Sequence, residues 1–208
     1  MSARTHADSL MWVEHGTGLF VTQAALLDEP AMTQPSILPG WTRKHLVAHV
    51  AANAEALGNL VHWARTGERT PMYSSAEQRN ADIEAGAKLS ATELQTWLNR
   101  AVHTLSGAMD ALTADDWQTE IVTAQGRAVP ATEIPWLRAR EVCVHAVDLG
   151  TGTTFADLPA EFLTALIADI RAKRGLDEVP GGPLPEVAAY LSGRPHTLAD
   201  VADLGPWL

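Results

Sequence analysis

The 208-residue chain has one cysteine, few basic residues and no long apolar run. The single Cys143 cannot form a disulfide within the chain, so we expect the reducing cytoplasm. Fifteen Lys and Arg stand against 25 Asp and Glu, a net charge of -10 that argues against nucleic acid and against a polybasic membrane patch. The start MSARTHADSL lacks the apolar segment of a signal peptide, and no run of about 18 apolar residues is present to span a bilayer.

Four common signatures are also missing. The chain contains no GxxxxGKS or GxxxxGKT loop, no GxGxxG turn, no GxSxG elbow and no HExxH helix. These absences exclude the simplest nucleotide-binding, hydrolase and zinc-protease interpretations. The hydrophobic fraction of 46% is enough for a packed core, so we expect one domain with a modest appendage.

What is present is helical periodicity. Apolar residues recur at helical spacing in four long segments, which cover residues 7–27, 42–65, 90–113 and a stretch that begins at Pro130 or Pro135 and ends at 149. Gly16 and Gly18 interrupt the first segment. The polar stretch 72–87 favours a short helix or an ordered loop, and residues 117–129 favour a small hairpin or an irregular crossover.

Four long helices joined by loops predict a mainly α fold, a four-helix bundle over residues 1–150. Residues 151–208 contain two further helical patterns, near 158–173 and 185–191, separated by the turn at 179–183. No flexible linker separates this part from the bundle. We therefore expect it to pack onto the bundle.

Glu141 and His145 lie four residues apart in the fourth segment, so both side chains leave the same helix face. Their neighbours Val142, Val144 and Val147 are apolar. A buried carboxylate and imidazole need a partner, and a metal ion provides one. A hydrogen-bonded Glu–His pair without metal, or simple exposure, stays open as an alternative.

His45 and His49 repeat the same spacing in the second segment, which an antiparallel bundle can place against the fourth. A three- or four-ligand metal centre is therefore feasible. Four protein ligands are typical of a structural zinc site, whereas two histidines and one carboxylate leave a position for water or substrate. Spacing alone does not decide whether His45 takes part.

Two further residues lie close to Glu141 and His145 in the sequence, Cys143 between them and Asp148 after them. Cys143 lies about 200° around the helix from each of them, so we interpret it as a small buried hydrophobic residue and not as a ligand or nucleophile. Asp148 follows His145 by three residues, and its carboxylate either orients the imidazole or lies at the helix end.

Four blocks of the sequence resemble the mycothiol-dependent maleylpyruvate isomerase family, within the DinB-like metal-binding four-helix bundles. They are LPGWTRKHLVAHVAANAEAL at 38–57, MYSSAEQRNADIEAGA at 72–87, REVCVHAVDLG at 140–150 and ADLGPWL at 202–208. The resemblance implies a bundle over 1–150 with a small helical or α+β appendage at 151–208. Longer relatives have a larger C-terminal region, so a reduced version is expected here.

The resemblance also implies a site. His49, Glu141 and His145 would bind a divalent metal ion, usually zinc, with His45 as a structural neighbour. Arg79, in the block QRNADIE, matches a position that the family places in the active site. Its planar, two-pronged cation suits a substrate carboxylate or a developing enolate.

The function that this resemblance implies is a zinc- and mycothiol-dependent cis–trans isomerisation of maleylpyruvate to fumarylpyruvate, by thiolate addition, bond rotation and elimination. One alternative is a mycothiol S-transferase that acts on another electrophile. Another is a metal-binding bundle without catalysis. The expected partners are mycothiol and a small electrophile, without nucleic acid or membrane, and the chain would be a monomer or a homodimer.

Overall fold

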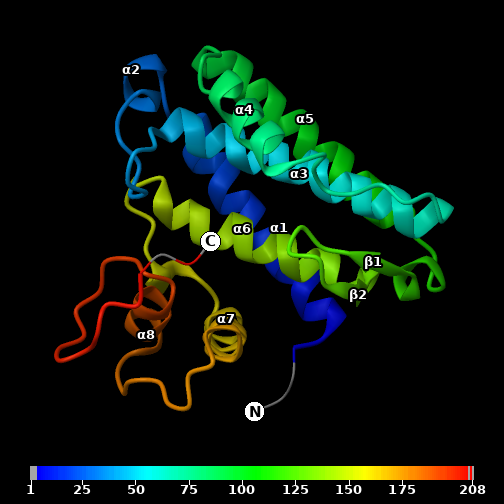
Figure 1. The fold of residues 1–208 in the computed structure, drawn as a ribbon. Helices are drawn as coiled ribbons and strands as arrows, with labels where there is room; N and C mark the ends of the chain where they lie inside the picture. Colours follow the sequence, from blue (N-terminus) through cyan, green and yellow to red (C-terminus); the bar gives the residue numbers. More distant parts are fainter. Residues whose placement is uncertain (1–3, 206, 208) are drawn as a thin grey trace.

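The computed structural model describes residues 4–205 and 207, and these residues form a mainly helical molecule, as predicted (Figure 1). Pro206 and Leu208 of the C-terminal sequence block lie outside the described residues. The helices are α1 (His6–Ala25), α2 (Glu29–Met32), α3 (Arg43–Thr66), α4 (Ala76–Gly86), α5 (Ala91–Asp110), α6 (Ile134–Asp148), α7 (Ala160–Arg174) and α8 (Leu184–Leu191).

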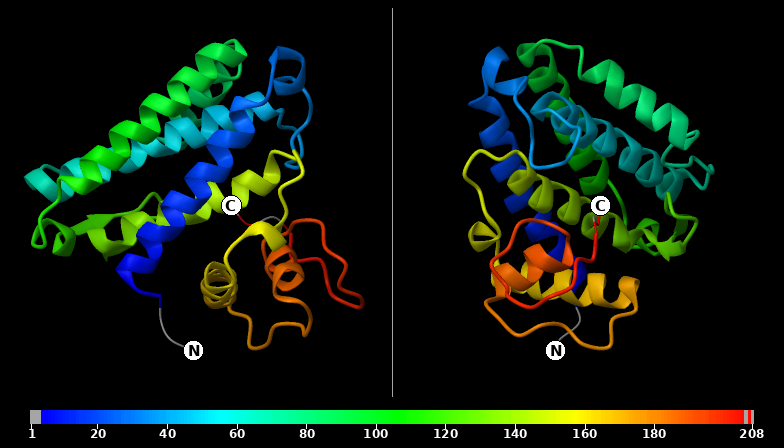
Figure 2. Two further views of the ribbon diagram at one scale, coloured as in Figure 1. Left: turned by 180° about the vertical axis from the view of Figure 1, so that it is seen from behind. Right: turned by 60° about the vertical axis from the view of Figure 1, so that its left-hand side comes forward.

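The four long helices α1, α3, α5 and α6 make up the bundle. Helix α1 crosses α6, and α3 lies along α5, as the two views in Figure 2 show. The core lies between these helices. It includes Phe20, Leu57 and Leu98, each of which is 1% exposed or less. Burial of such side chains is the main stabilising term of a bundle.

Helix α1 runs through Gly16 and Gly18 without a break. Gly16 lies at the crossing with α6, where a Cβ would come within 2.5 Å of Cys143 Sγ and 2.7 Å of Val142 Cγ2. A Cβ on Gly18 would meet nothing within 4 Å. Gly16, one of the two glycines that interrupt the sequence pattern, is therefore the residue that lets α1 and α6 approach each other.

The chain between α5 and α6 forms the small hairpin that the sequence allowed. Strands β1 (Glu120–Val122) and β2 (Ala128–Pro130) pair antiparallel, with Ile121 opposite Val129. Pro130 ends β2, and a short 3-10 turn separates it from Ile134, where α6 begins. Helix α6, the fourth long helix, thus starts near Pro135 and not at Pro130, because Pro130 is the last residue of strand β2.

The polar stretch before α5 is a helix, α4, that lies beside α3 (Figure 1). Ser75 caps it, since the Ser75 hydroxyl accepts a hydrogen bond from the Gln78 backbone N–H over 3.1 Å. Most of its side chains are exposed, whereas Ile83 and Gly86 are buried. This placement brings Arg79, on α4, toward the interior of the bundle.

The C-terminal part packs on the α1–α6 side of the bundle through aromatic side chains. Phe162 of α7 lies 5.8 Å from the Trp12 ring of α1 and 5.9 Å from the Trp136 ring of α6, measured between ring centroids. The segment after α8 then returns toward α6 (Figure 1). Within the described part of the chain, no helix is both long and apolar enough to cross a membrane.

Candidate metal centre

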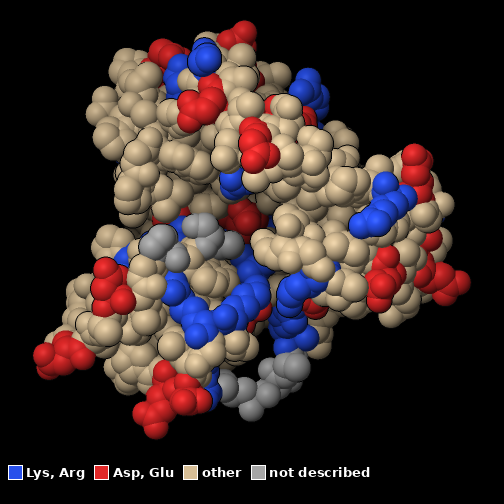
Figure 3. Space-filling view, in the orientation of Figure 1, with Lys and Arg blue, Asp and Glu red and all other residues tan. Residues whose placement is uncertain are grey.

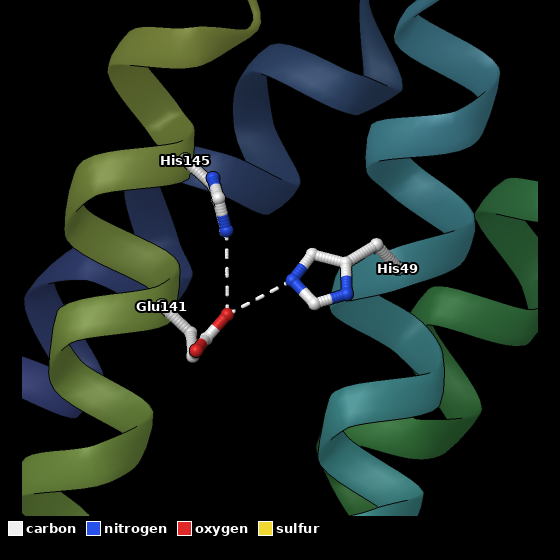
Figure 4. A group of neighbouring side chains, drawn as sticks. All are labelled: His49, Glu141 and His145. Carbon is white, nitrogen blue, oxygen red and sulfur yellow. Dashed lines mark hydrogen bonds and ion pairs between the residues drawn. The ribbon is translucent and has the colours of Figure 1, made fainter. Parts of the chain in front are cut away.

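The structure brings His49 of α3 together with Glu141 and His145 of α6 (Figure 4). Glu141 Oε2 lies 3.0 Å from His49 Nε2 and 3.3 Å from His145 Nε2. One potential ligand atom from each residue falls within 4.8 Å of the others. The i, i+4 spacing on α6 therefore supplies two of the three groups on one face, and the neighbouring helix supplies the third.

All three side chains are buried or nearly so. His49 is 5% exposed, His145 is 2% exposed, and the side chain of Glu141 is 15% exposed. Burying a carboxylate between two imidazoles is favourable only if charge and hydrogen bonds are matched. The group therefore needs either a proton or a metal ion between its members.

Without a metal, protons hold the group together. Burial alone would raise the pKa of Glu141, but hydrogen bonds from His145 and His49 hold it well below its usual value. Burial lowers the pKa of His49, so this imidazole is neutral at pH 7. The pKa of His145 rises to about 9, because hydrogen bonds to Asp148 and Glu141 outweigh its burial. A metal ion that binds here displaces these protons.

Asp148 fixes the orientation of the His145 imidazole. His145 Nδ1–H donates to Asp148 Oδ2 over 2.8 Å, which leaves Nε2 to face Glu141. Asp148 is itself fully buried and accepts two hydrogen bonds from Arg194, Nε to Oδ1 at 3.1 Å and Nη2 to Oδ2 at 2.7 Å. A carboxylate behind a ligating histidine is the usual way in which proteins orient a metal ligand.

The sequence pattern does not point to Arg194. It lies 46 positions beyond Asp148, in the loop after α8, and is 4% exposed. No spacing rule connects it with α6. A cation this far along the chain can be assigned to the site only from the tertiary structure.

Arg79 reaches the group from α4. Its Nη2–H donates to His49 Nδ1 over 3.2 Å, and its guanidinium carbon lies 5.8 Å from the centre of the Tyr73 ring. His49 Nδ1 accepts this bond while its Nε2–H donates to Glu141, which is the neutral tautomer that the lowered pKa of His49 requires. Arg79 is half-buried, and it also lines a cavity next to the three residues, which is described below.

His45 does not join the group. Its Nδ1 lies 3.2 Å from the Thr42 backbone N and 2.7 Å from Thr42 Oγ1, and these contacts close the N-terminal cap of α3. Its Nε2 lies 3.6 Å from the exposed Glu84 carboxylate. The two histidines of α3 therefore have different surroundings: His45 is a capping residue and His49 faces α6.

Cys143 is turned away from the group, as its helical position predicts. Its thiol is fully buried against α1, with Sγ 3.6 Å from the Trp12 carbonyl oxygen. Burial raises the pKa of the Cys143 thiol. A neutral thiol in an apolar crossing cannot act as a nucleophile at this site.

Two cavities border the three residues, and Arg79 lines both of them. One, of about 1000 Å³, borders His49 and His145 and is lined by Trp41, Tyr190 and Arg194. The other, of about 470 Å³, borders His49 and Glu141 and extends past Tyr73 and Arg79. Volumes of this size accommodate small molecules. Two different reactants can therefore approach the group at the same time.

Comparison with known proteins gives the same family by sequence and by structure. The family described as "Mycothiol maleylpyruvate isomerase N-terminal domain" matches residues 13–150. A crystal structure of the mycothiol-dependent maleylpyruvate isomerase is 37% identical with a TM-score of 0.92, and that of an alanine-for-histidine variant is 36% identical with the same TM-score. Both matches cover 100% of either chain and so include residues 151–208. No curated protein sequence matches.

Proposed function

Because this chain belongs to the mycothiol-dependent maleylpyruvate isomerase family, we propose that it is a zinc-dependent enzyme that converts maleylpyruvate to fumarylpyruvate with mycothiol as the thiol. The observation that carries the proposal is the convergence of His49, Glu141 and His145 at the junction of two cavities. The family match over residues 13–150 includes these three residues, Asp148, and Arg79 on α4.

The three side chains fit a catalytic zinc ion. Two imidazole nitrogens and one carboxylate oxygen are the donor set of zinc sites that keep a position open for a reactant. Their ligand atoms already lie within 4.8 Å of one another, and Asp148 holds His145 in the tautomer that leaves Nε2 free to ligate. Zinc bound there supplies a low thiol pKa, and hence a thiolate at neutral pH.

The proposed reaction involves no net change of oxidation state. Addition of the thiolate to the cis double bond converts it to a single bond, the two halves rotate, and elimination of the same thiolate leaves the trans isomer. The thiol must come from outside the chain, because Cys143 is buried against Trp12 and protonated. Arg79 pairs with the negative charge of the substrate, a carboxylate or the enolate that develops on addition.

The contact between Arg79 and His49 supports this role. A histidine that ligates through Nε2 carries its remaining proton on Nδ1, where it can no longer accept the hydrogen bond that Arg79 donates over 3.2 Å. The guanidinium is then available to the substrate. In the proposed reaction, Arg79 binds an anionic group of the substrate beside the reacting double bond.

An assay of maleylpyruvate with and without mycothiol tests the proposal, together with a panel of other small electrophiles and a measurement of bound metal. Isomerisation that needs both mycothiol and a stoichiometric metal ion is the expected result. Stable thiol adducts with other electrophiles, without isomerisation, would identify an S-transferase instead. Isomerisation by metal-free protein would contradict the role of the three residues.

A further inference from the structure

A third cavity, of about 380 Å³, is lined by Glu141 but not by His145. Besides Glu141, it is lined by three basic residues, Arg127, Arg140 and Lys173, and by the Trp207 ring. Lys and Arg side chains gather in the middle of this face, around the hollow between the bundle and α7 (Figure 3). Such a concentration is unexpected in a chain with a net charge of -10.

The positive charge of this cavity is only partly matched. Arg140 Nη1 and Lys173 Nζ both donate to the same oxygen, Asp169 Oδ2, at 3.1 and 2.8 Å. Among the described residues, no acidic side chain forms an ion pair with Arg127. Burial and the neighbouring charge of Arg140 lower the pKa of Lys173, which is the effect of crowded cations.

Arg140 also carries an unused donor. The residue is 6% exposed, and its buried Nε–H has no hydrogen-bond partner among the described residues. A buried N–H without an acceptor is unfavourable, so such groups in folded proteins usually have a ligand or water as a partner. An anion in the cavity would accept this bond and balance the surplus charge.

This cavity adjoins the 470 Å³ cavity that Arg79 lines. The two share Asn53, Met72, Ala124, Gln125 and Glu141 in their linings. Basic side chains therefore line both neighbouring cavities, Arg79 one and Arg140 the other, and Glu141 lines both. A small molecule with an anionic group at each end matches this arrangement.

We propose that Arg127, Arg140 and Lys173 form a subsite for a distal carboxylate of the electrophile, so that the enzyme selects small dicarboxylates over monocarboxylates. The proposal rests on the proposed function, in which maleylpyruvate carries two carboxylates. Arg79 binds one end of the dianion, and the basic subsite binds the other. The double bond between them then lies beside the three metal-ligating residues.

Binding of maleate to the EDTA-treated full chain tests the subsite without turnover. Titration calorimetry gives the affinity. Because the chain has seven tryptophans, the local signal is the part of the fluorescence change that Trp207→Phe abolishes; the Trp207 ring lies 5.4 Å from both the Arg140 guanidinium and Lys173 Nζ. Maleamate, which replaces one carboxylate by an amide, should bind wild type at least tenfold more weakly than maleate. Equal binding of both, or equally tight binding of inorganic phosphate, would overturn the proposal.

Arg127→Gln and Lys173→Gln are the informative variants, since both side chains border solvent and their replacement leaves the core intact. Each should weaken maleate binding about tenfold and remove most of the preference over maleamate. The matched controls are Arg65→Gln and Lys88→Gln, two exposed residues outside the cavity, which should bind like wild type. Unchanged maleate affinity in both test variants would refute the subsite.

The same variants separate this proposal from the proposed function. If wild type isomerises maleylpyruvate while neither variant raises KM, the function stands and the subsite is wrong. If wild type has no isomerase activity but the variants lose maleate binding, the subsite stands and the reaction is wrong. A rise in KM with little change in kcat, together with weaker maleate binding, supports both.

Discussion

Asp148 Oδ2 lies 2.8 Å from His145 Nδ1, one turn along α6, and this contact decides which imidazole nitrogen faces Glu141. Because Nδ1–H is committed to a buried carboxylate, Nε2 is the nitrogen that is left for a metal ion. Arg194 in turn holds both oxygens of Asp148. The proposed metal site therefore depends on a chain of contacts that extends from α6 to the loop after α8.

Asp148→Asn should lower zinc affinity by roughly 10- to 100-fold, because the amide neither attracts the Nδ1 proton as strongly nor matches Arg194. Competition with a chromophoric chelator measures the affinity. Asp177→Asn, at an exposed position after α7, is the matched control and should bind zinc like wild type. Wild-type affinity in Asp148→Asn would show that this contact does not support the metal.

His49→Ala and His45→Ala should separate the two histidines of α3. Loss of His49 removes one of three ligands, so both bound metal and activity should be lost. Loss of His45 removes the cap contact with Thr42 and should cost about 1 kcal/mol of unfolding free energy while metal remains bound. Metal analysis and thermal unfolding measure the two effects, and equal loss of metal in both variants would contradict a three-ligand site.

Arg79→Lys should lower turnover and leave metal content at the wild-type level. The substitution keeps the positive charge but loses the planar pair of donors that suits a carboxylate. Steady-state kinetics and metal analysis on the same preparation measure both quantities. An unimpaired variant, or robust isomerisation by wild type without added thiol, would refute the mechanism even if the three ligands are correct.

Stability of the metal-free protein should fall as pH rises from about 6.5 through about 9. The folded-state pKa of His145 is raised to about 9 from an ordinary value of 6.5, so its stabilising contribution is complete below pH 6.5 and is lost as the folded imidazole deprotonates. The loss is about 3 kcal/mol at most. Urea unfolding of EDTA-treated protein across this range measures it, and His145→Gln should flatten the slope. An equal slope in that variant would assign the effect to other groups.

Gly16→Ala should destabilise the bundle by about 1–3 kcal/mol, because the new methyl group would overlap Cys143 Sγ and Val142 at the crossing of α1 and α6. Gly18→Ala is the matched control two residues away. Its methyl group meets nothing within 4 Å, so it should stabilise the helix by about 0.5–1 kcal/mol. Urea unfolding of both variants checks the pair, and a Gly16→Ala variant as stable as wild type, or more stable, would show that the crossing is not tightly packed.

Local periodicity was enough to predict the helices and the directions of their side chains. Apolar spacing predicted the four long helices, and the i, i+4 spacing of Glu141 and His145 predicted that both face the same side of α6. The position of Cys143, about 200° around that helix, predicted that its thiol points elsewhere. These predictions were correct because a helix fixes the direction of each side chain relative to its neighbours within a few residues.

At two positions, Gly16 and Pro130, the preference of the nearby sequence does not decide the structure. Gly16 lowers helix propensity, yet the close approach of α6 outweighs that cost of about 1 kcal/mol. Pro130 is compatible with a helix start, but pairing of β1 with β2 includes it in the hairpin. In both places a contact with a distant segment overrides a preference that the nearby sequence expresses.

The contacts between residues far apart in the chain follow from how the helices pack. The separation of His45 from His49 depends on how α3 packs against α6, and the contact of Arg194 with Asp148 depends on the return of the chain after α8. The basic cavity combines residues from the hairpin, α6 and α7. No periodic rule links such residues, because the packing of whole elements, and not the geometry of one helix, sets the distance between them.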